Sequence, residues 1–130
     1  AGNTIVGVWH NAIWQIRDDK TDKYTMANGR FVDDFNVALD NLFADEEFMQ
    51  SLSDIQNQQA EATDLMKKMK NPPDKYAEAA AALKESYDNY IKFTGCVIDP
   101  RGSLNSFSED FVKYDEAVAD SLQKLELYFD

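Results

Sequence analysis

The sequence has one cysteine, Cys96, and one histidine, His10. A single cysteine excludes an intramolecular disulfide and any cysteine-based zinc site. A catalytic triad, a two-histidine carboxylate site or a three-histidine zinc site would need further partners or a second chain. Helical di-iron bundles need Glu-x-x-His pairs, but the residue three before His10 is Gly7. We therefore predict no metal site, no cofactor and no catalytic residues.

Basic residues are also scarce, at 13 Lys and Arg against 24 Asp and Glu, which gives a formal charge of −11. Such an acidic surface repels the phosphates of nucleic acids and of anionic membranes, so we expect no nucleic-acid partner. No apolar run approaches the roughly 18 residues of a membrane span, so we expect no transmembrane segment in this chain.

Glycine and proline are few, at five and three residues, and most of them border the predicted helices. There is no linker, low-complexity segment or clear repeat. A length of 130 residues suits one ordinary domain, so we predict a single domain over 1–130. Strands are not expected, because alternation of β-branched residues is absent. The chain opens Ala-Gly-Asn without Met, so we interpret it as a processed or trimmed form, and any secretion signal would precede it.

What the sequence does contain is apolar residues at helical spacing. The first predicted helix covers Thr4–Asp19, with Ile5, Trp9, Ala12 and Ile16 on one face. A polar stretch from Lys20 to Gly29 follows, and its last two residues, Asn28-Gly29, are a turn signal.

The second helical region runs from about Arg30 to Lys70. Its apolar stripe jumps six residues from Leu42 to Phe48, which breaks the helical phase, and three acidic residues stand at the jump. Acidic residues favour the start of a helix, where they complement its dipole. We predict a break near Ala44–Asp45. One continuous bent helix is the alternative.

Asn71-Pro72-Pro73 ends this region, because a residue before proline avoids the helical conformation. The third predicted helix covers Pro73–Thr94, with Gly95 as its C-cap. A loop over 96–102 follows, and Ser103 or Ser106 is expected to cap the fourth helix. That helix has apolar residues alternately three and four apart, from Leu104 to Tyr128, with Ser121 the one polar member.

The predicted fold class is all-α: an up-and-down bundle of four main helices, with the second long and broken near Ala44–Asp45. Helices joined by short loops become antiparallel neighbours, which is the basis of this arrangement. The predicted core residues are Trp9, Ile16, Phe35, Leu39, Leu42, Phe48, Leu52, Ile55, Leu83, Tyr87, Tyr90, Phe107, Phe111, Tyr114, Val118 and Leu125.

Few residues suggest chemistry. Cys96 lies beside Val97 and Ile98, so we predict a buried, inert thiol. The acidic stretch from Asp18 to Asp22 resembles a calcium loop only partly, because lysines occupy its third and sixth positions; a solvated helix end is the better interpretation.

Two further patterns could indicate function. A haem pair of His10 with Met66 or Met69 is conceivable, but methionines at helical spacing usually fill cores. Gln59 and Ser121 interrupt apolar stripes, so they either line a polar pocket or set register through local hydrogen bonds.

Trp14 stands apart from the core pattern. On a helical wheel it lies opposite Trp9 and Ile16, with His10 and Arg17 among its neighbours. Either a loop covers it or it is an exposed anchor, and Trp and Arg are common at binding hot spots. We predict partial exposure and an interaction patch of His10, Trp14 and Arg17, suited to a transient contact with another protein or a weak homodimer.

One resemblance concerns the segment from Asn71-Pro72-Pro73 to Tyr90, with Tyr-Ala-Glu-Ala and Leu-Lys-Glu-Ser-Tyr-Asp-Asn-Tyr. It resembles uncharacterised helical domains of secreted or lipid-anchored proteins of Gram-positive bacteria. The likeness implies an extracellular or cell-envelope location, with the cytoplasm as the alternative, and it transfers no catalytic residues. Because the sequence has a single histidine, an acidic composition and no catalytic constellation, we expect a non-catalytic interaction or structural module. The alternative is a carrier that binds a small ligand or cofactor in the bundle interior.

Overall fold

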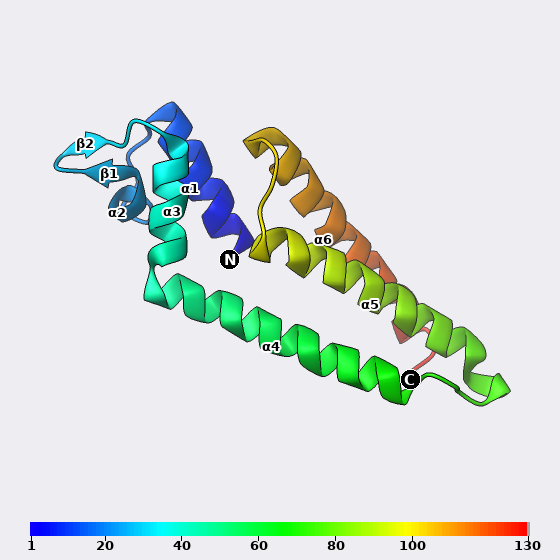
Figure 1. The fold of residues 1–130 in the computed structure, drawn as a ribbon. Coiled ribbons are helices and arrows are strands. Elements are labelled where there is room, and N and C mark those ends of the chain that lie inside the picture. Colours follow the sequence, from blue (N-terminus) through cyan, green and yellow to red (C-terminus); the bar gives the residue numbers. More distant parts are fainter. Residues whose placement is uncertain (130) are drawn as a thin grey trace.

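Helices make up most of the chain, which confirms the predicted helical class. A computed structural model describes residues 1–129 (Figure 1). The elements in chain order are α1 (Gly2–Trp14), α2 (Asp22–Thr25), β1 (Met26–Ala27), β2 (Arg30–Phe31), α3 (Phe35–Ala44), α4 (Glu46–Lys68), the 3₁₀ turn η1 (Asp74–Tyr76), α5 (Ala77–Ile98) and α6 (Leu104–Glu126).

These elements form a lobe and an extension. The lobe contains α1, α2, the two short strands and α3, and the extension contains the long helices α4, α5 and α6 (Figure 1). Within the extension, α5 packs most closely on α6 and less extensively on α4. The finer prediction of four main helices in one up-and-down bundle is not confirmed, because α1 packs on α3 and on the start of α6.

Helix α1 is displaced from its predicted bounds of Thr4–Asp19. It begins at Gly2 and ends at Trp14, where Gln15 adopts a left-handed conformation with φ of 53°. The Ile16 amide then donates to the Asn11 carbonyl at 3.1 Å, a bond that closes the helix end. The turn takes Ile16 off the buried face and leaves it 44% exposed, so its prediction as a core residue was wrong.

Asn28-Gly29 forms a turn, as predicted, and the turn joins two short antiparallel strands. Met26 pairs with Phe31 and Ala27 with Arg30. Both turn residues have positive φ, 54° and 78°, which is the backbone that two-residue hairpin turns require and that Asn-Gly supplies. The expectation of no strands was therefore wrong for these four residues, which are too few to show an alternating pattern.

The predicted break in the second helical region is confirmed. Helix α3 ends at Ala44, Asp45 is extended with ψ of 123°, and α4 begins at Glu46. The Asp45 carboxylate accepts a hydrogen bond from the Tyr24 hydroxyl at 2.6 Å and lies 3.7 Å from Lys23 Nζ. The break is therefore tied to α2, and the alternative of one continuous helix is wrong.

Asp45 should make stability depend on pH. The hydrogen bond from Tyr24 is the main cause that lowers the pKa of Asp45 below its usual 3.8, and Lys23 adds to it. A carboxyl group whose pKa is lower in the folded state stabilises the fold at any pH above its unfolded-state pKa. This stabilisation is lost as the pH falls through the folded-state pKa. We expect Asp45→Asn to be less stable than the wild type at pH 7, with the difference shrinking below pH 3.8.

Urea denaturation between pH 7 and pH 2 measures this difference. Asp33→Asn, at an exposed acidic residue of the same lobe, is the matched control and should show a smaller change. A difference between wild type and Asp45→Asn that stays constant down to pH 2 would contradict the role given to the ionised carboxylate.

Helix α5 is also displaced from its prediction of Pro73–Thr94. It begins at Ala77, after the 3₁₀ turn, and continues to Ile98. Gly95 lies inside the helix, so the prediction that it is the C-cap was wrong. The C-cap is instead Asp99, the residue before Pro100, where proline disfavours helical backbone.

Both serines that the sequence offered as caps for the last helix take part in capping it. Ser103 is the N-cap, and its hydroxyl accepts from the Ser106 amide at 3.1 Å. The Ser106 hydroxyl accepts from the Ser103 amide at 2.9 Å, which completes a capping box. These two bonds fix where α6 begins.

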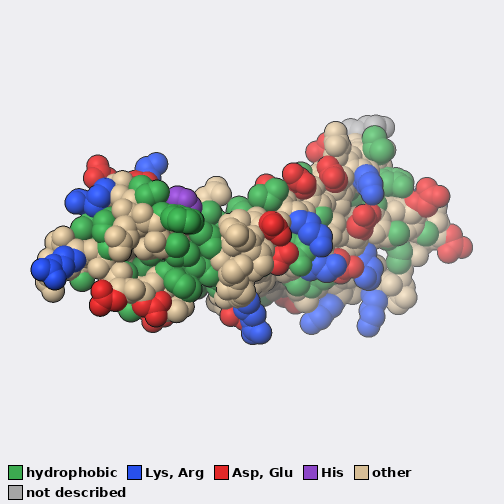
Figure 2. All heavy atoms as spheres, turned by 90° about the horizontal axis from the view of Figure 1, so that it is seen from above, with side chains coloured by type: hydrophobic (Ala, Val, Ile, Leu, Met, Phe, Trp, Pro, Cys, Tyr) green, Lys and Arg blue, Asp and Glu red, His purple; other side chains and the backbone are tan. Residues whose placement is uncertain are grey.

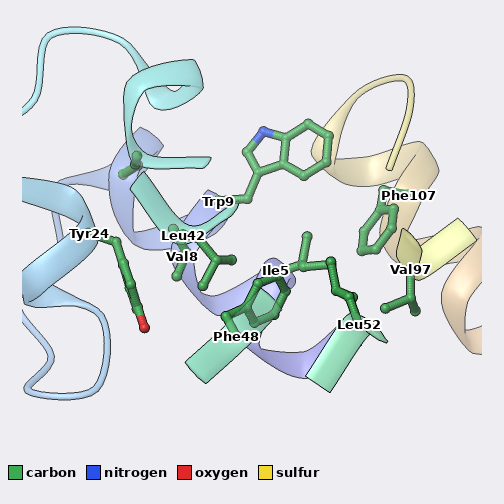
Figure 3. Close-up of a cluster of buried hydrophobic side chains, with 11 residues drawn as sticks. Ile5, Val8, Trp9, Tyr24, Leu42, Phe48, Leu52, Val97 and Phe107 are labelled. Carbon is green, nitrogen blue, oxygen red and sulfur yellow. The ribbon is translucent and has the colours of Figure 1, made fainter. Parts of the chain in front are cut away.

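The buried core lies where the lobe meets the extension. Trp9 stacks on Phe35 with ring centroids 5.8 Å apart, and its indole lies 5.7 Å from the Phe107 ring. Figure 3 shows side chains from α1, α3, α4 and the start of α6 converging there. The buried apolar residues are Ile5, Val8, Trp9, Ala12, Tyr24, Ala38, Leu42, Phe48, Leu52, Val97 and Phe107. This list confirms the core prediction for Trp9, Leu42, Phe48, Leu52 and Phe107.

The remaining predicted core residues are only half-buried. Phe35, Leu39, Ile55 and Phe111 pack against the buried cluster. Further along the extension, a second set of half-buried residues lies away from it: Leu83, Tyr87, Tyr90, Tyr114, Val118 and Leu125. Among residues 53–96 and 108–129, the buried ones are Ser86, Thr94 and Ser121, none of them apolar. The described part of the extension therefore has no buried apolar core of its own.

Aromatic stacking and hydrogen bonds join the helices of the extension: the rings of Phe93 in α5 and Phe111 in α6 stack with their centroids 5.2 Å apart. Gln59 Nε2 donates to Thr94 Oγ1 at 2.6 Å, and the hydroxyls of Thr63 and Tyr87 lie 2.7 Å apart. Ser121 donates to the Val118 carbonyl within its own helix at 3.0 Å. Gln59 and Ser121 thus form hydrogen bonds, as in the second of the two interpretations; the bond of Gln59 joins two helices, and that of Ser121 stays within α6.

Candidate functional site

The last turn of α1 carries an exposed aromatic pair. Trp14 is 66% exposed, which confirms its predicted exposure. His10 is also exposed, and its ring centroid lies 6.4 Å from that of Trp14 at an interplanar angle of 48°. The two residues meet because positions i and i+4 share one face of a helix.

Two further exposed isoleucines lie close to this pair in the sequence, one in the last turn of α1 and one just after it. Ile13 is 41% exposed and Ile16 is 44% exposed. Figure 2 shows the histidine, in purple, beside a group of hydrophobic side chains on this lobe. Exposed aromatic and aliphatic side chains gathered in one place are typical of contact sites. We call His10, Ile13, Trp14 and Ile16 the α1 patch.

Arg17 is placed differently from the prediction. It follows the end of α1, and its Nε donates to Asp22 Oδ2 at 3.0 Å while 67% of its side chain stays exposed. Asp22 also accepts from the Asp18 amide at 2.9 Å, the main cause that lowers the pKa of Asp22. Within residues 1–129, Arg17 forms no cation–π pair with either tryptophan. The structure therefore brings His10 and Trp14 together and directs Arg17 to Asp22.

The acidic side chains of the calcium-like stretch, from Asp18 to Asp22, form local hydrogen bonds. Asp18 accepts from the Lys20 amide at 2.9 Å and Asp22 is held by Arg17, so these acids order the turn before α2. In residues 1–129, no three His, Cys, Asp or Glu side chains gather in an arrangement that could hold a metal ion.

The haem pair is excluded within one chain by position. His10 is on α1 in the lobe, and Met66 and Met69 are at the far end of α4 (Figure 1). An axial pair must flank one iron from both sides. The methionines instead line a groove.

The groove lies between the last turns of α4 and the first turns of α5. Its volume is about 460 Å³, within the range of small-molecule pockets. Its apolar lining comes from two methionines and small residues, and its rim carries lysines. The lining residues are Thr63, Met66, Lys67, Met69, Lys70, Pro72, Ala80, Ala81, Lys84, Tyr87 and Asp88.

Cys96 is half-buried on α5, where its thiol donates to the Phe93 carbonyl at 3.0 Å. Burial is the main cause that raises the pKa of the thiol above its usual value, and the charge of Asp110 adds to it. Less thiolate therefore forms at neutral pH, and the thiolate is the reactive species.

We expect Cys96 to react slowly with a thiol reagent such as 5,5′-dithiobis(2-nitrobenzoate) at pH 7. The measurement compares the folded chain with the chain in concentrated denaturant, where labelling should be much faster. Equal rates in the two states would show an accessible thiol and reopen a redox role for this residue.

Comparisons of the chain with protein-family models, curated proteins and solved structures give no match. In the part of the chain that the structure describes, no helix is both long and apolar enough to cross a membrane.

Sequence reasoning identified two of the four residues of the α1 patch, His10 and Trp14, and missed Ile13, Ile16 and the groove. The patch was visible because Trp14 breaks the pattern of a one-sided helix. The groove depends on how closely α4 and α5 approach each other, which the sequence does not state. One signal was present: five of the 13 basic residues lie between positions 67 and 84.

Proposed function

We propose that this chain is a non-catalytic helical module that binds another protein, or a second copy of itself, through the α1 patch. The observation that carries the proposal is Trp14, an indole left 66% exposed next to His10, with exposed isoleucines at positions 13 and 16. An indole buried in a contact contributes a large area at a small cost in conformational entropy. The modest size of the patch suits a transient contact or a weak homodimer.

We further propose an extracellular or cell-envelope location, with the cytoplasm as the alternative. The support for this location is the sequence resemblance of residues 71–90. The up-and-down bundle of four helices also stays a proposal. Its support is that α4, α5 and α6 alternate in direction (Figure 1). Helix α1 would be the fourth member, and it would pack on the others only at the end nearest the lobe.

Site-specific photocrosslinking tests the contact. A photoreactive phenylalanine analogue replaces Trp14 in one variant and Leu65 in the control, since Leu65 is 60% exposed on α4, away from the patch. We expect a discrete adduct from position 14 and none from position 65. Sedimentation equilibrium of the wild type and Trp14→Ala then shows whether the partner is a second copy. Adducts from both positions, or from neither, would contradict the proposal.

A second candidate function is a small-ligand carrier, which the groove between α4 and α5 favours. The groove has the volume and apolar lining of a ligand site. It differs from the carrier site expected from the sequence, because it opens on the surface of the extension and Gln59 is not part of it.

A further inference from the structure

The groove between α4 and α5 is bounded along its length. The hydrogen-bonded hydroxyls of Thr63 and Tyr87 cross from α4 to α5 near one end, and Pro72 of the interhelical turn lines the other. Between Ala80 and Asp88, the span along α5 is eight residues, or about 12 Å at 1.5 Å per residue. A continuous partner helix would need an open path at both ends, whereas a short flexible chain fits between these limits.

The floor of the groove is apolar and adaptable. Met66 of α4 and Met69, the residue after that helix, line the groove together with Ala80 and Ala81 of α5. Methionine is unbranched and polarisable, so it adjusts to the shape of an apolar ligand. The alanines leave the space that a chain of methylene groups would occupy.

The rim of the groove is positively charged, in contrast to the chain as a whole. The charged residues that line the groove are three lysines and Asp88, whereas the whole chain has a net charge of −11. Lys84 Nζ is already 2.8 Å from Asp88. Lys67 and Lys70 form no ion pair within residues 1–129, so they remain to bind an anion.

We propose that the groove binds a single-chain carboxylate, with its hydrocarbon chain along Met66, Met69 and Ala81 and its head group at Lys67 and Lys70. This inference rests on the carrier function proposed above and is independent of the α1 patch. Apolar contact with the floor supplies the affinity, and the two lysines select a negative head group.

Isothermal titration calorimetry tests the proposal with the full chain and three probes below their micellar concentrations: laurate, dodecanol and dodecyltrimethylammonium. We expect one laurate per chain, weaker binding of dodecanol and no binding of the cation. The joint change Lys67→Gln and Lys70→Gln should weaken laurate binding about fivefold, since exposed ion pairs are weak individually. The charge-matched control is Lys92→Gln with Lys113→Gln, outside the groove, and it should have little effect.

A second set of variants tests the location of the site by filling the groove with a larger side chain. Ala81→Trp should weaken laurate binding at least tenfold, and Ala119→Trp, at an exposed alanine of α6, should not. Ala80→Trp replaces Ala81→Trp if circular dichroism shows that the latter loses helix. Laurate binding unchanged by the tryptophan variants would overturn the assignment to this groove. Equal binding of laurate and dodecanol would overturn the carboxylate while leaving the carrier function. Binding of none of the three probes would overturn both.

Discussion

Replacing Phe107 by alanine is expected to lower the free energy of unfolding by about 3–5 kcal/mol, the usual cost of removing a buried aromatic ring. Phe107 is 2% exposed, and its ring lies 5.7 Å from that of Trp9 and 6.2 Å from that of Phe111. Because α1 contacts α6 through these rings, the substitution opens a cavity where the lobe joins the extension. A loss of this size is a large share of the stability of an ordinary domain.

Urea denaturation followed by far-ultraviolet circular dichroism measures the loss. Phe129→Ala is the matched control, since Phe129 follows the same helix and is 64% exposed. We expect the control to change stability by no more than about 0.5 kcal/mol, as surface substitutions usually do. Similar losses for the two variants would mean that the core is not where the structure places it.

Leucine-to-alanine substitutions should have very different costs at the two ends of the molecule. Leu42 is fully buried in α3, so Leu42→Ala should cost about 3–4 kcal/mol, within the measured range for buried leucines. Leu83 is only half-buried in α5. Its substitution removes less buried surface and leaves an opening that water can fill, so Leu83→Ala should cost about 1 kcal/mol.

The same denaturation experiment compares the two leucine variants at one pH and temperature. Leu52→Ala, at a buried leucine of α4, serves as the control and should resemble Leu42→Ala. Equal costs for Leu42→Ala and Leu83→Ala would show that the extension buries its apolar stripe as well as the lobe does, for example through self-association in solution.

Local signals in the sequence predicted much of the helical structure. The six-residue step before Phe48 located the break at Asp45, and the serines at 103 and 106 located the start of α6. Helix ends that depend on a single backbone conformation were predicted less well. The left-handed turn at Gln15 and the continuation of α5 through Gly95 are examples, since neither residue type dictates its conformation there.

The burial of individual side chains was harder to predict from the sequence than the positions of the helices. Apolar spacing showed which face of each helix is hydrophobic, but the spacing is the same whether that face meets a complete core or a loosely packed neighbour. Leu83, Tyr87 and Leu125 have the pattern of core residues and are half-buried. The same reasoning applies to the candidate sites: Trp14 could be identified from one helix, whereas the groove needs the relative position of two.

The division of buried surface between lobe and extension has a consequence for amide hydrogen exchange. Backbone amides in α1 and α3 are protected by the buried cluster, and exchanging them requires opening most of the molecule. The end of α4 and the start of α5 contain no buried apolar residue on the turn side of the Thr63–Tyr87 hydroxyl pair, which joins the two helices farther from the turn. This hairpin should therefore open as a separate cooperative unit, at a lower free energy than global unfolding, and its amides should exchange first. A long-chain ligand in the groove would slow exchange in that hairpin while leaving α1 unchanged.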